Sequence, residues 1–168
     1  MKTAMVHWWH DLQAWRAYQA AAIQDALAAL PSPVCVVFTA HSLPERVLVD
    51  DPYPEQLVAS ATAIARMCDL EYEHWRTAWQ SAARTPEPWR GPDILEEIDA
   101  IADEGRFASL LVCPQGFTSD HLEVLYDLDV VARDRAGSRG LAFARTRSVN
   151  DDESVLTALA ARVKQEHP

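Results

Sequence analysis

Residues 107–129, FASLLVCPQGFTSDHLEVLYDLD, join a continuous apolar run to a segment rich in acids. The run at 110–113 is typical of a strand that is buried on both faces, and the residues after it have helical spacing. Because helix positions three and four apart are neighbours, Asp120, Glu123 and Asp127 are expected on one face of that helix. Ligands of open α/β sheets bind at the carboxyl edge of the strands, which is where these acids begin.

The same succession of helix, strand and loop repeats along the chain. Apolar and β-branched runs predict strands at residues 34–39, 74–80, 107–113 and 141–146. Helical periodicity predicts helices at residues 11–30, 54–70, 93–105 and 121–136, and Asn150 with Glu153 marks the start of a last helix as a capping box. Strands separated by helices predict an α/β three-layer domain with a central parallel sheet of about four strands.

Composition limits the class of protein. The chain has 168 residues, of which 49% are hydrophobic, so a single globular domain over residues 1–168 can bury a continuous core. The formal net charge of -10, without a cluster of lysine and arginine, argues against nucleic-acid binding. A neutral or cationic ligand is easier to accommodate.

Location is read from the cysteines and from the apolar runs. Cys35, Cys68 and Cys113 are odd in number and far apart, which predicts neither a disulfide framework nor a paired-cysteine metal site and favours a reducing cytoplasm. Residues 1–6 lack the apolar core of a signal peptide, and no run approaches the ~20 apolar residues of a membrane span. We therefore expect a cytoplasmic protein without a transmembrane segment.

A histidine and an acid are expected to meet at the carboxyl edge. His41 follows the first strand and Glu123 follows the third, so parallel topology brings both to the same edge. A neutral imidazole opposite a carboxylate suits Fe²⁺ held loosely enough to be released, or a proton. Structural explanations stay open, since His41 can also cap a strand or bond a loop carbonyl, and Asp120 with Glu123 has capping-box spacing. Asp127, one turn on, is less easily explained by capping.

Aromatic and histidine residues outside this pair divide into two groups. Trp75 and Trp79 flank Thr77 at strand spacing and are expected in the core. Trp89, in a proline-rich loop at the ligand edge, can instead stack on a flat ligand. His7 and His10 are three apart, which is compatible with a metal if they are helical. We expect packing at a terminus or an interface for these two instead.

Five segments in order resemble the carboxyl-terminal half of ferrochelatase. They are FTAHSLPERV at 38–47, DDPYPEQL at 50–57, WQSAARTPEPWRGPD at 79–93, VCPQGF at 112–117 and SDHLEVLYDLD at 119–129. Residues 1–32 resemble the crossover helix region that leads into that half, and residues 33–168 the metal-site-bearing α/β domain. The resemblance thus covers nearly the whole chain and implies a chelatase-like fold.

The resemblance implies roles for particular residues. His41 and Glu123 would be the metal and catalytic pair, holding Fe²⁺ and taking the pyrrole protons as the ion enters the porphyrin. Asp127 would continue the acidic line as a path for protons or cations, in a helix widened locally to a π turn. Ser81 and Trp89 match positions that line the substrate cleft. The function implied is insertion of iron into coproporphyrin III or protoporphyrin IX in haem biosynthesis.

Two departures from the family bear on this expectation. Val131 stands where the family usually has a further glutamate, and family members are about twice as long, their amino-terminal domain supplying much of the porphyrin pocket. The chain is then a fragment, a subunit pairing with a separate amino-terminal half, or a homodimer, and we expect a second chelatase domain as partner. The alternative is a non-catalytic tetrapyrrole-binding or interaction module. Three scattered cysteines are one fewer than the usual four ligands, so no iron-sulfur cluster is expected.

Overall fold

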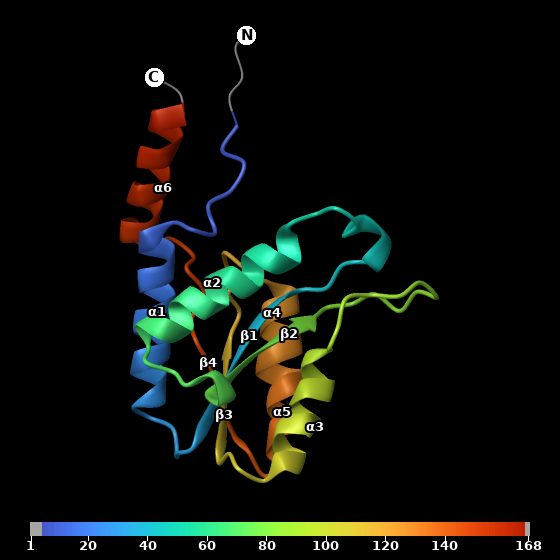
Figure 1. The fold of residues 1–168 in the computed structure, drawn as a ribbon. Helices are drawn as coiled ribbons and strands as arrows, with labels where there is room; N and C mark the ends of the chain where they lie inside the picture. The colour runs from blue at the N-terminus through green and yellow to red at the C-terminus, as the bar shows by residue number, and fades with distance from the viewer. Residues whose placement is uncertain (1–4, 167–168) are drawn as a thin grey trace.

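A four-stranded parallel sheet lies between two helical layers in the computed structural model, which describes residues 5–166 (Figure 1). In spatial order the strands are β2 (Trp75–Gln80), β1 (Val34–His41), β3 (Ser109–Cys113) and β4 (Ala142–Arg145), and all three neighbouring pairs are parallel. The three-layer α/β fold expected from the sequence is confirmed. Most of segment 1–6, on which the expectation of no export signal rests, lies outside the described residues.

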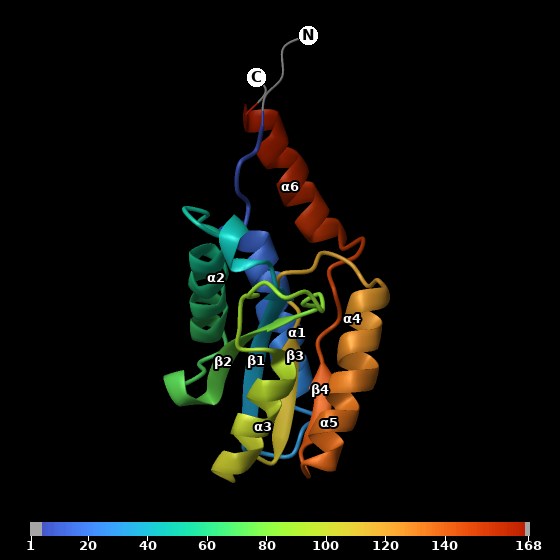
Figure 2. The same cartoon turned by 90° about the vertical axis from the view of Figure 1, so that its right-hand side faces the viewer.

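The helices cover both faces of the sheet. One layer holds α1 (Gln13–Leu27) and α2 (Tyr53–Met67), and the other holds α3 (Ile94–Glu104) and a long helix built from α4 (Leu122–Tyr126), a π-helical segment (Asp127–Ala132) and α5 (Arg133–Ser138). The last helix, α6 (Glu153–Glu166), extends beyond the carboxyl edge of the sheet (Figures 1 and 2). Short 3₁₀ turns occupy Glu45–Val47 and Tyr72–His74. Within residues 5–166, no helix combines the length and apolar character needed to cross a membrane.

Alternate residues of β1 face opposite helical layers, as the period of two along a strand requires. Val36 and Phe38 belong to the core cluster that includes residues of α1 and α2, whereas Cys35 and Val37 belong to the cluster that includes α3 and α4. Each of these four side chains is at most 1% exposed. The same alternation places His41, the last residue of β1, on the side of α4.

The helix expected at residues 121–136 is present, but its start excludes Asp120. Its amino-terminal cap is His121, so Asp120 lies before the helix and does not share a face with Glu123 and Asp127. The capping box between Asp120 and Glu123 does not form, because the Asp120 carboxylate accepts hydrogen bonds from Ser148, Asn150 and Arg145 instead. The π turn implied by the resemblance is present, at Asp127–Ala132.

The start of α6 also corrects an expectation. Asn150 does not form a capping box with Glu153; its amide donates to Asp120, and the Asp152 carboxylate instead accepts from the backbone N–H groups of Ser154 and Val155. These bonds and the Ser154 hydroxyl lower the pKa of Asp152. Asp152 is therefore the residue that caps α6.

Removing this cap has a measurable consequence. We expect Asp152→Ala to lower the melting temperature by a few degrees at pH 7, because two N–H groups at the helix start lose their acceptor. Asp151→Ala is the matched control, since Asp151 is an exposed neighbouring acid. Thermal unfolding followed by circular dichroism compares the two, and equal melting temperatures would show that Asp152 does not cap α6.

Candidate functional site

His41 and Glu123 face each other at the carboxyl edge of the sheet, with 3.5 Å between His41 Nε2 and Glu123 Oε2. His41 Nδ1 lies 2.5 Å from the carbonyl oxygen of Ser42. Because a carbonyl can only accept, Nδ1 is the donor of this bond, and Nε2 is the ring nitrogen that faces the carboxylate. The side chains are 32% and 50% exposed, so the pair is open to a ligand. His41 thus makes the bond to a loop carbonyl that was one structural explanation for it, and it faces Glu123 at the same time.

The loop after β3 fixes the surroundings of His41. Gly116 crosses β1 so closely that a Cβ at this position would lie 2.5 Å from the Cβ of Ala40, so a side chain here forces the backbone apart. This close approach brings Phe117 to the edge, where its ring centroid lies 6.3 Å from that of His41 and 5.4 Å from that of His121. The imidazole is therefore held by packing as well as by its bond to Ser42.

Ser81 and Asp127 form a second contact at this edge. The Ser81 hydroxyl donates to Asp127 Oδ2 at 2.5 Å, joining the loop after β2 to the first residue of the π segment. Ser81 has a φ of 62°, a left-handed conformation that non-glycine residues rarely adopt. Strained backbone of this kind clusters at functional sites, where the surrounding structure holds the residue in place. Here it accompanies a hydroxyl that is aimed at Asp127.

Ser81, Asp127 and Val131 line one cleft of about 480 Å³. Gln80, Arg84 and Asp93 are further polar residues of this cleft that were not expected from the sequence. Gln80 is 1% exposed, and neither its amide nitrogen nor its amide oxygen has a partner within the protein. In the sequence, the only indication was that a polar residue ends an apolar strand.

Asp93 lines the cleft and also caps a helix. Its carboxylate accepts from the backbone N–H of Leu95 and caps α3 in a capping box with Glu96. Burial, with the nearby charges of Glu96 and Asp127, raises the pKa of Asp93. Asp93 thus keeps its proton to a higher pH than an ordinary aspartate does.

The expected tryptophans separate in the structure. Trp79 is 6% exposed and confirmed as a core residue, while Trp75 is only half-buried and packs edge-on against Phe38. Trp89 donates its indole N–H to Thr85 within its own loop and pairs through its backbone with Pro44. Trp89 does not line the cleft that holds Ser81 and Asp127.

Metal-ligating groups are sparse in the described residues. Residues 5–166 contain no group of three or more histidine, cysteine, aspartate or glutamate side chains placed to hold a metal ion. The cysteines are free, and burial raises the pKa of Cys35 and Cys113 to about 12 and that of Cys68 to about 11. These thiols are poor metal ligands, because the thiolate is the form that binds.

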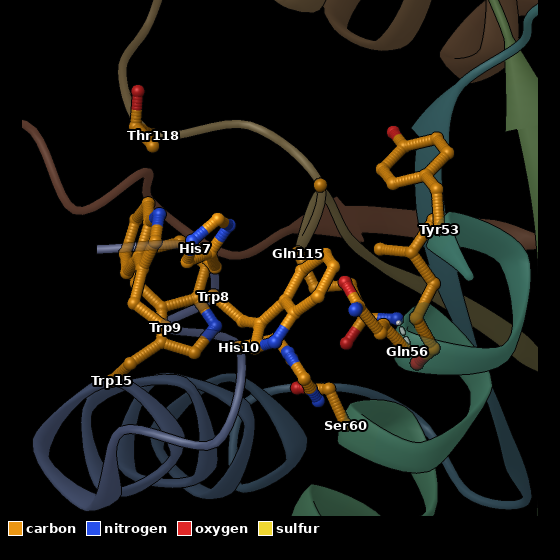
Figure 3. Close-up of a pocket in the computed structure, with 12 residues that line it drawn as sticks. His7, Trp8, Trp9, His10, Trp15, Tyr53, Gln56, Ser60, Gln115 and Thr118 are labelled. Atoms are coloured by element: carbon orange, nitrogen blue, oxygen red, sulfur yellow. Dashed lines mark hydrogen bonds between the residues drawn. The ribbon is translucent and has the colours of Figure 1, made fainter. Parts of the chain in front are cut away.

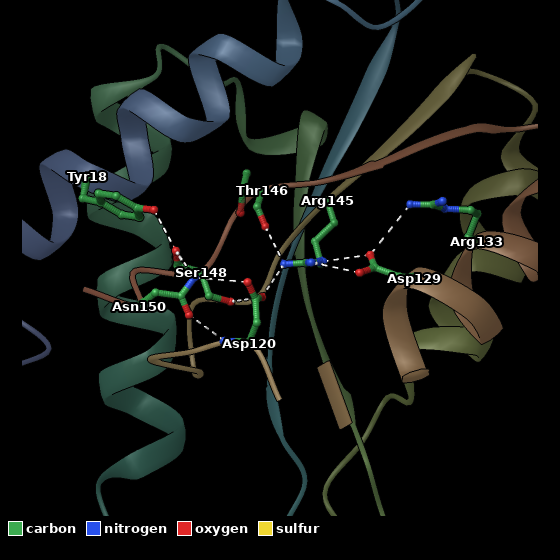
Figure 4. A network of polar contacts seen from close by, with 8 residues as sticks. All are labelled: Tyr18, Asp120, Asp129, Arg133, Arg145, Thr146, Ser148 and Asn150. Atoms are coloured by element: carbon green, nitrogen blue, oxygen red, sulfur yellow. Dashed lines mark hydrogen bonds and ion pairs between the residues drawn. The ribbon is translucent and has the colours of Figure 1, made fainter. Parts of the chain in front are cut away.

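A polar network anchors the π segment to β4 (Figure 4). Arg145 donates from Nε and Nη2 to the two carboxylate oxygens of Asp129, both at 2.9 Å, and from Nη1 to Asp120 at 3.1 Å. Burial alone would raise the pKa of Asp120, but hydrogen bonds from Asn150 and Ser148 and the charge of Arg145 outweigh it and lower that pKa. Asp120 thus serves this network and not the edge pair.

Comparison with known proteins agrees with this geometry. Residues 1–167 match the ferrochelatase family model. A ferrochelatase of Herpetosiphon aurantiacus is 42% identical over 95% of this chain and 53% of its own length, and one of Thermus thermophilus is 43% identical over 82% and 43%. A coproporphyrin III ferrochelatase of Halalkalibacterium halodurans is 33% identical over 94% and 51%. The chain spans about half the length of these curated relatives, and it belongs to the ferrochelatase family.

Proposed function

We propose that this chain provides the metal-binding half of a ferrochelatase site and, with a second domain, inserts Fe²⁺ into a porphyrin in haem biosynthesis. The His41–Glu123 pair is the observation that carries this proposal, supported by the names of the related proteins. Coproporphyrin III and protoporphyrin IX are both candidate substrates. The three free cysteines fit a reducing compartment such as the cytoplasm.

The spacing of the pair suits a single metal ion. First-row metals bind imidazole nitrogen and carboxylate oxygen at about 2.1 Å, which puts two ligands of a tetrahedral ion about 3.4 Å apart. The observed distance between His41 Nε2 and Glu123 Oε2 is 3.5 Å. Two protein ligands leave the remaining positions of the ion for porphyrin nitrogens, so Fe²⁺ is held as a substrate to be passed on.

The same two groups can accept protons. A porphyrin loses two pyrrole N–H protons when Fe²⁺ takes their place, and the imidazole Nε2 and the carboxylate are bases at the metal face. Asp127, held by Ser81, would receive protons next. Val131 offers no acceptor one turn later, so Asp93 is the further carboxyl group of the cleft that can continue the path.

A second domain is needed to enclose the porphyrin. The helix that carries Glu123 and Asp127 exposes four large apolar side chains: Leu122 (78% exposed), Leu125 (43%), Tyr126 (56%) and Val130 (45%). Apolar side chains gathered beside a site mark an interaction surface. We propose that a second chelatase domain covers them, either another copy of this chain or a separate amino-terminal half.

Assembly and activity can be measured together. We expect gel filtration to show a species larger than the 18.8 kDa monomer, and expect that species to insert Fe²⁺ or Zn²⁺ into coproporphyrin III or protoporphyrin IX, seen as metalloporphyrin absorbance. The assay is run on the chain alone and with an added amino-terminal ferrochelatase half. Porphyrin binding without insertion in every assembly state would instead identify a non-catalytic tetrapyrrole-binding module.

A further inference from the structure

A cavity of about 200 Å³ lies between α1, α2 and the loop after β3 (Figure 3). It is lined by residues 7–10, by Trp15 of α1, by the first half of α2 and by the loop after β3, and it is partly open to solvent on the side of the exposed His7 and Trp8. Neither His41 nor Glu123 lines it, and a porphyrin is far too large to enter it. The cavity is therefore separate from the proposed metal site.

Three polar atoms around this cavity have no hydrogen-bond partner within the protein. They are His10 Nδ1, Ser60 Oγ and Gln115 Oε1. Ser60 is 2% exposed and Gln115 is 5% exposed, and a buried polar group is destabilising when it stays unpaired. Since buried polar groups are nearly always satisfied, three of them around one space indicate a polar ligand.

The direction of one hydrogen bond defines what the ligand must bring. The Gln115 amide nitrogen donates to the backbone carbonyl of Leu57 at 3.0 Å, which fixes the side chain and leaves Oε1 as the free atom. An amide oxygen only accepts, so the ligand must carry an N–H or O–H donor. The Ser60 hydroxyl can donate in return to a carbonyl or ring nitrogen of the same molecule.

The charge and shape of the cavity wall narrow the class of ligand further. Aspartate, glutamate, lysine and arginine are all absent from the residues that line the cavity, and burial lowers the pKa of His10, which favours its uncharged form. The wall is aromatic, with the rings of Trp8, Trp9, Trp15 and Tyr53. Flat apolar surfaces of this kind bind planar rings, and an ionic ligand would find no counter-charge.

We propose that this cavity binds an uncharged, flat heteroaromatic molecule of one or two fused rings. Its N–H or O–H group donates to Gln115 Oε1, its carbonyl or ring nitrogen accepts from Ser60, and its ring lies among the tryptophans. His10 serves as a further neutral partner. This binding does not depend on metal insertion.

Quinolin-2(1H)-one is a suitable probe, because it is uncharged and bicyclic and carries one N–H and one carbonyl. For its roughly 11 non-hydrogen atoms, a Kd of about 1 mM is expected by ligand-observed NMR or calorimetry on the whole chain. The N-methyl derivative keeps the ring and carbonyl but lacks the donor. It should bind at least about tenfold more weakly, since Gln115 Oε1 then stays unpaired.

Variants locate the binding. Ser60→Ala removes the hydroxyl and Trp8→Ala removes part of the aromatic wall; both are expected to weaken binding several-fold. Trp8 is 49% exposed, so its removal leaves the fold intact even if Ser60→Ala does not fold. Tyr72→Ala, at an aromatic residue that is 86% exposed and outside the cavity, should bind as the parent does. No saturable binding, equal binding of the N-methyl derivative, or equal binding by Trp8→Ala would each overturn the proposal.

Discussion

His41→Ala is expected to reduce metal insertion by at least about 100-fold while the melting temperature changes by less than about 2 °C. Loss of the imidazole removes one of two metal ligands and one of two proton acceptors, and a positioned general base alone contributes about 100- to 10,000-fold. The fold is spared because the side chain stands at the sheet edge, 32% exposed, and belongs to none of the three core clusters.

The measurement pairs an insertion assay with thermal unfolding on the same preparation. His74→Ala is the control, since His74 lies at the amino end of β2, at the opposite edge of the sheet, and should insert metal at the parent rate. Glu123→Gln should lose insertion as His41→Ala does, again without loss of stability, because the side chain is 50% exposed. A large fall in melting temperature with His41→Ala would instead assign the residue to its bond with Ser42.

The His41–Glu123 pair could be predicted because it depends on the topology of the sheet and not on the packing of side chains. Apolar runs separated by helices give a parallel sheet, and parallel strands carry the residues that follow them to one edge. His41 is in fact the last residue of β1, two positions past the expected strand end, since its pairing with Gln80 extends the ladder. That shift changes a boundary and leaves the side chain at the same edge.

Asp120 could not be placed from local spacing. Three residues before Glu123, it reads as a helix cap or as a third acid of one face. Its actual partners, Ser148 and Asn150, lie 28 and 30 residues away in the chain, after β4. Periodicity also says nothing of the unpaired amide of Gln80 or of the cavity beside Ser60, because both depend on how separate elements pack.

The second large effect is expected at Arg145, the centre of the network in Figure 4. Arg145→Met keeps the volume of the side chain but removes the cation that Asp129 and Asp120 share, and it leaves Asp129 only the longer contact with the exposed Arg133, at 3.8 Å. Breaking a fully buried pair costs about 3–5 kcal/mol. Because the Asp129 and Asp120 side chains are 27% and 31% exposed, solvent screening reduces the expected loss in the free energy of unfolding to about 2 kcal/mol.

The pH dependence of this loss gives a second readout. Since the pKa of Asp120 is lowered in the folded state, its charge stabilises the fold above the ordinary carboxyl pKa, and that stabilisation fades as pH falls through the folded-state value. Urea unfolding should therefore show the full difference between parent and Arg145→Met at pH 7. Below about pH 4 the difference should shrink, because a protonated Asp120 gains nothing from the cation.

The matched control is Arg135→Met. Arg135 also donates to one aspartate, Asp99, through two nitrogens. The Arg135 side chain is 45% exposed, against 12% for Arg145, and Asp99 keeps a second cation in Arg139, so removing Arg135 should change stability little. If both variants lose the same stability, the network around Arg145 is an ordinary surface cluster.

A larger loss at Arg145 has a consequence for the site. Asp129 belongs to the π segment, two residues after Asp127, and π turns are rare, short interruptions of α-helices, so contacts from outside the helix are expected to support this one. Amide hydrogen exchange across Asp127–Ala132 should then rise in Arg145→Met and stay unchanged in Arg135→Met. The ion pair between Arg145 of β4 and Asp129 would thus keep Asp127 within hydrogen-bonding distance of Ser81. An arginine outside the cleft would then fix the position of an acid within it.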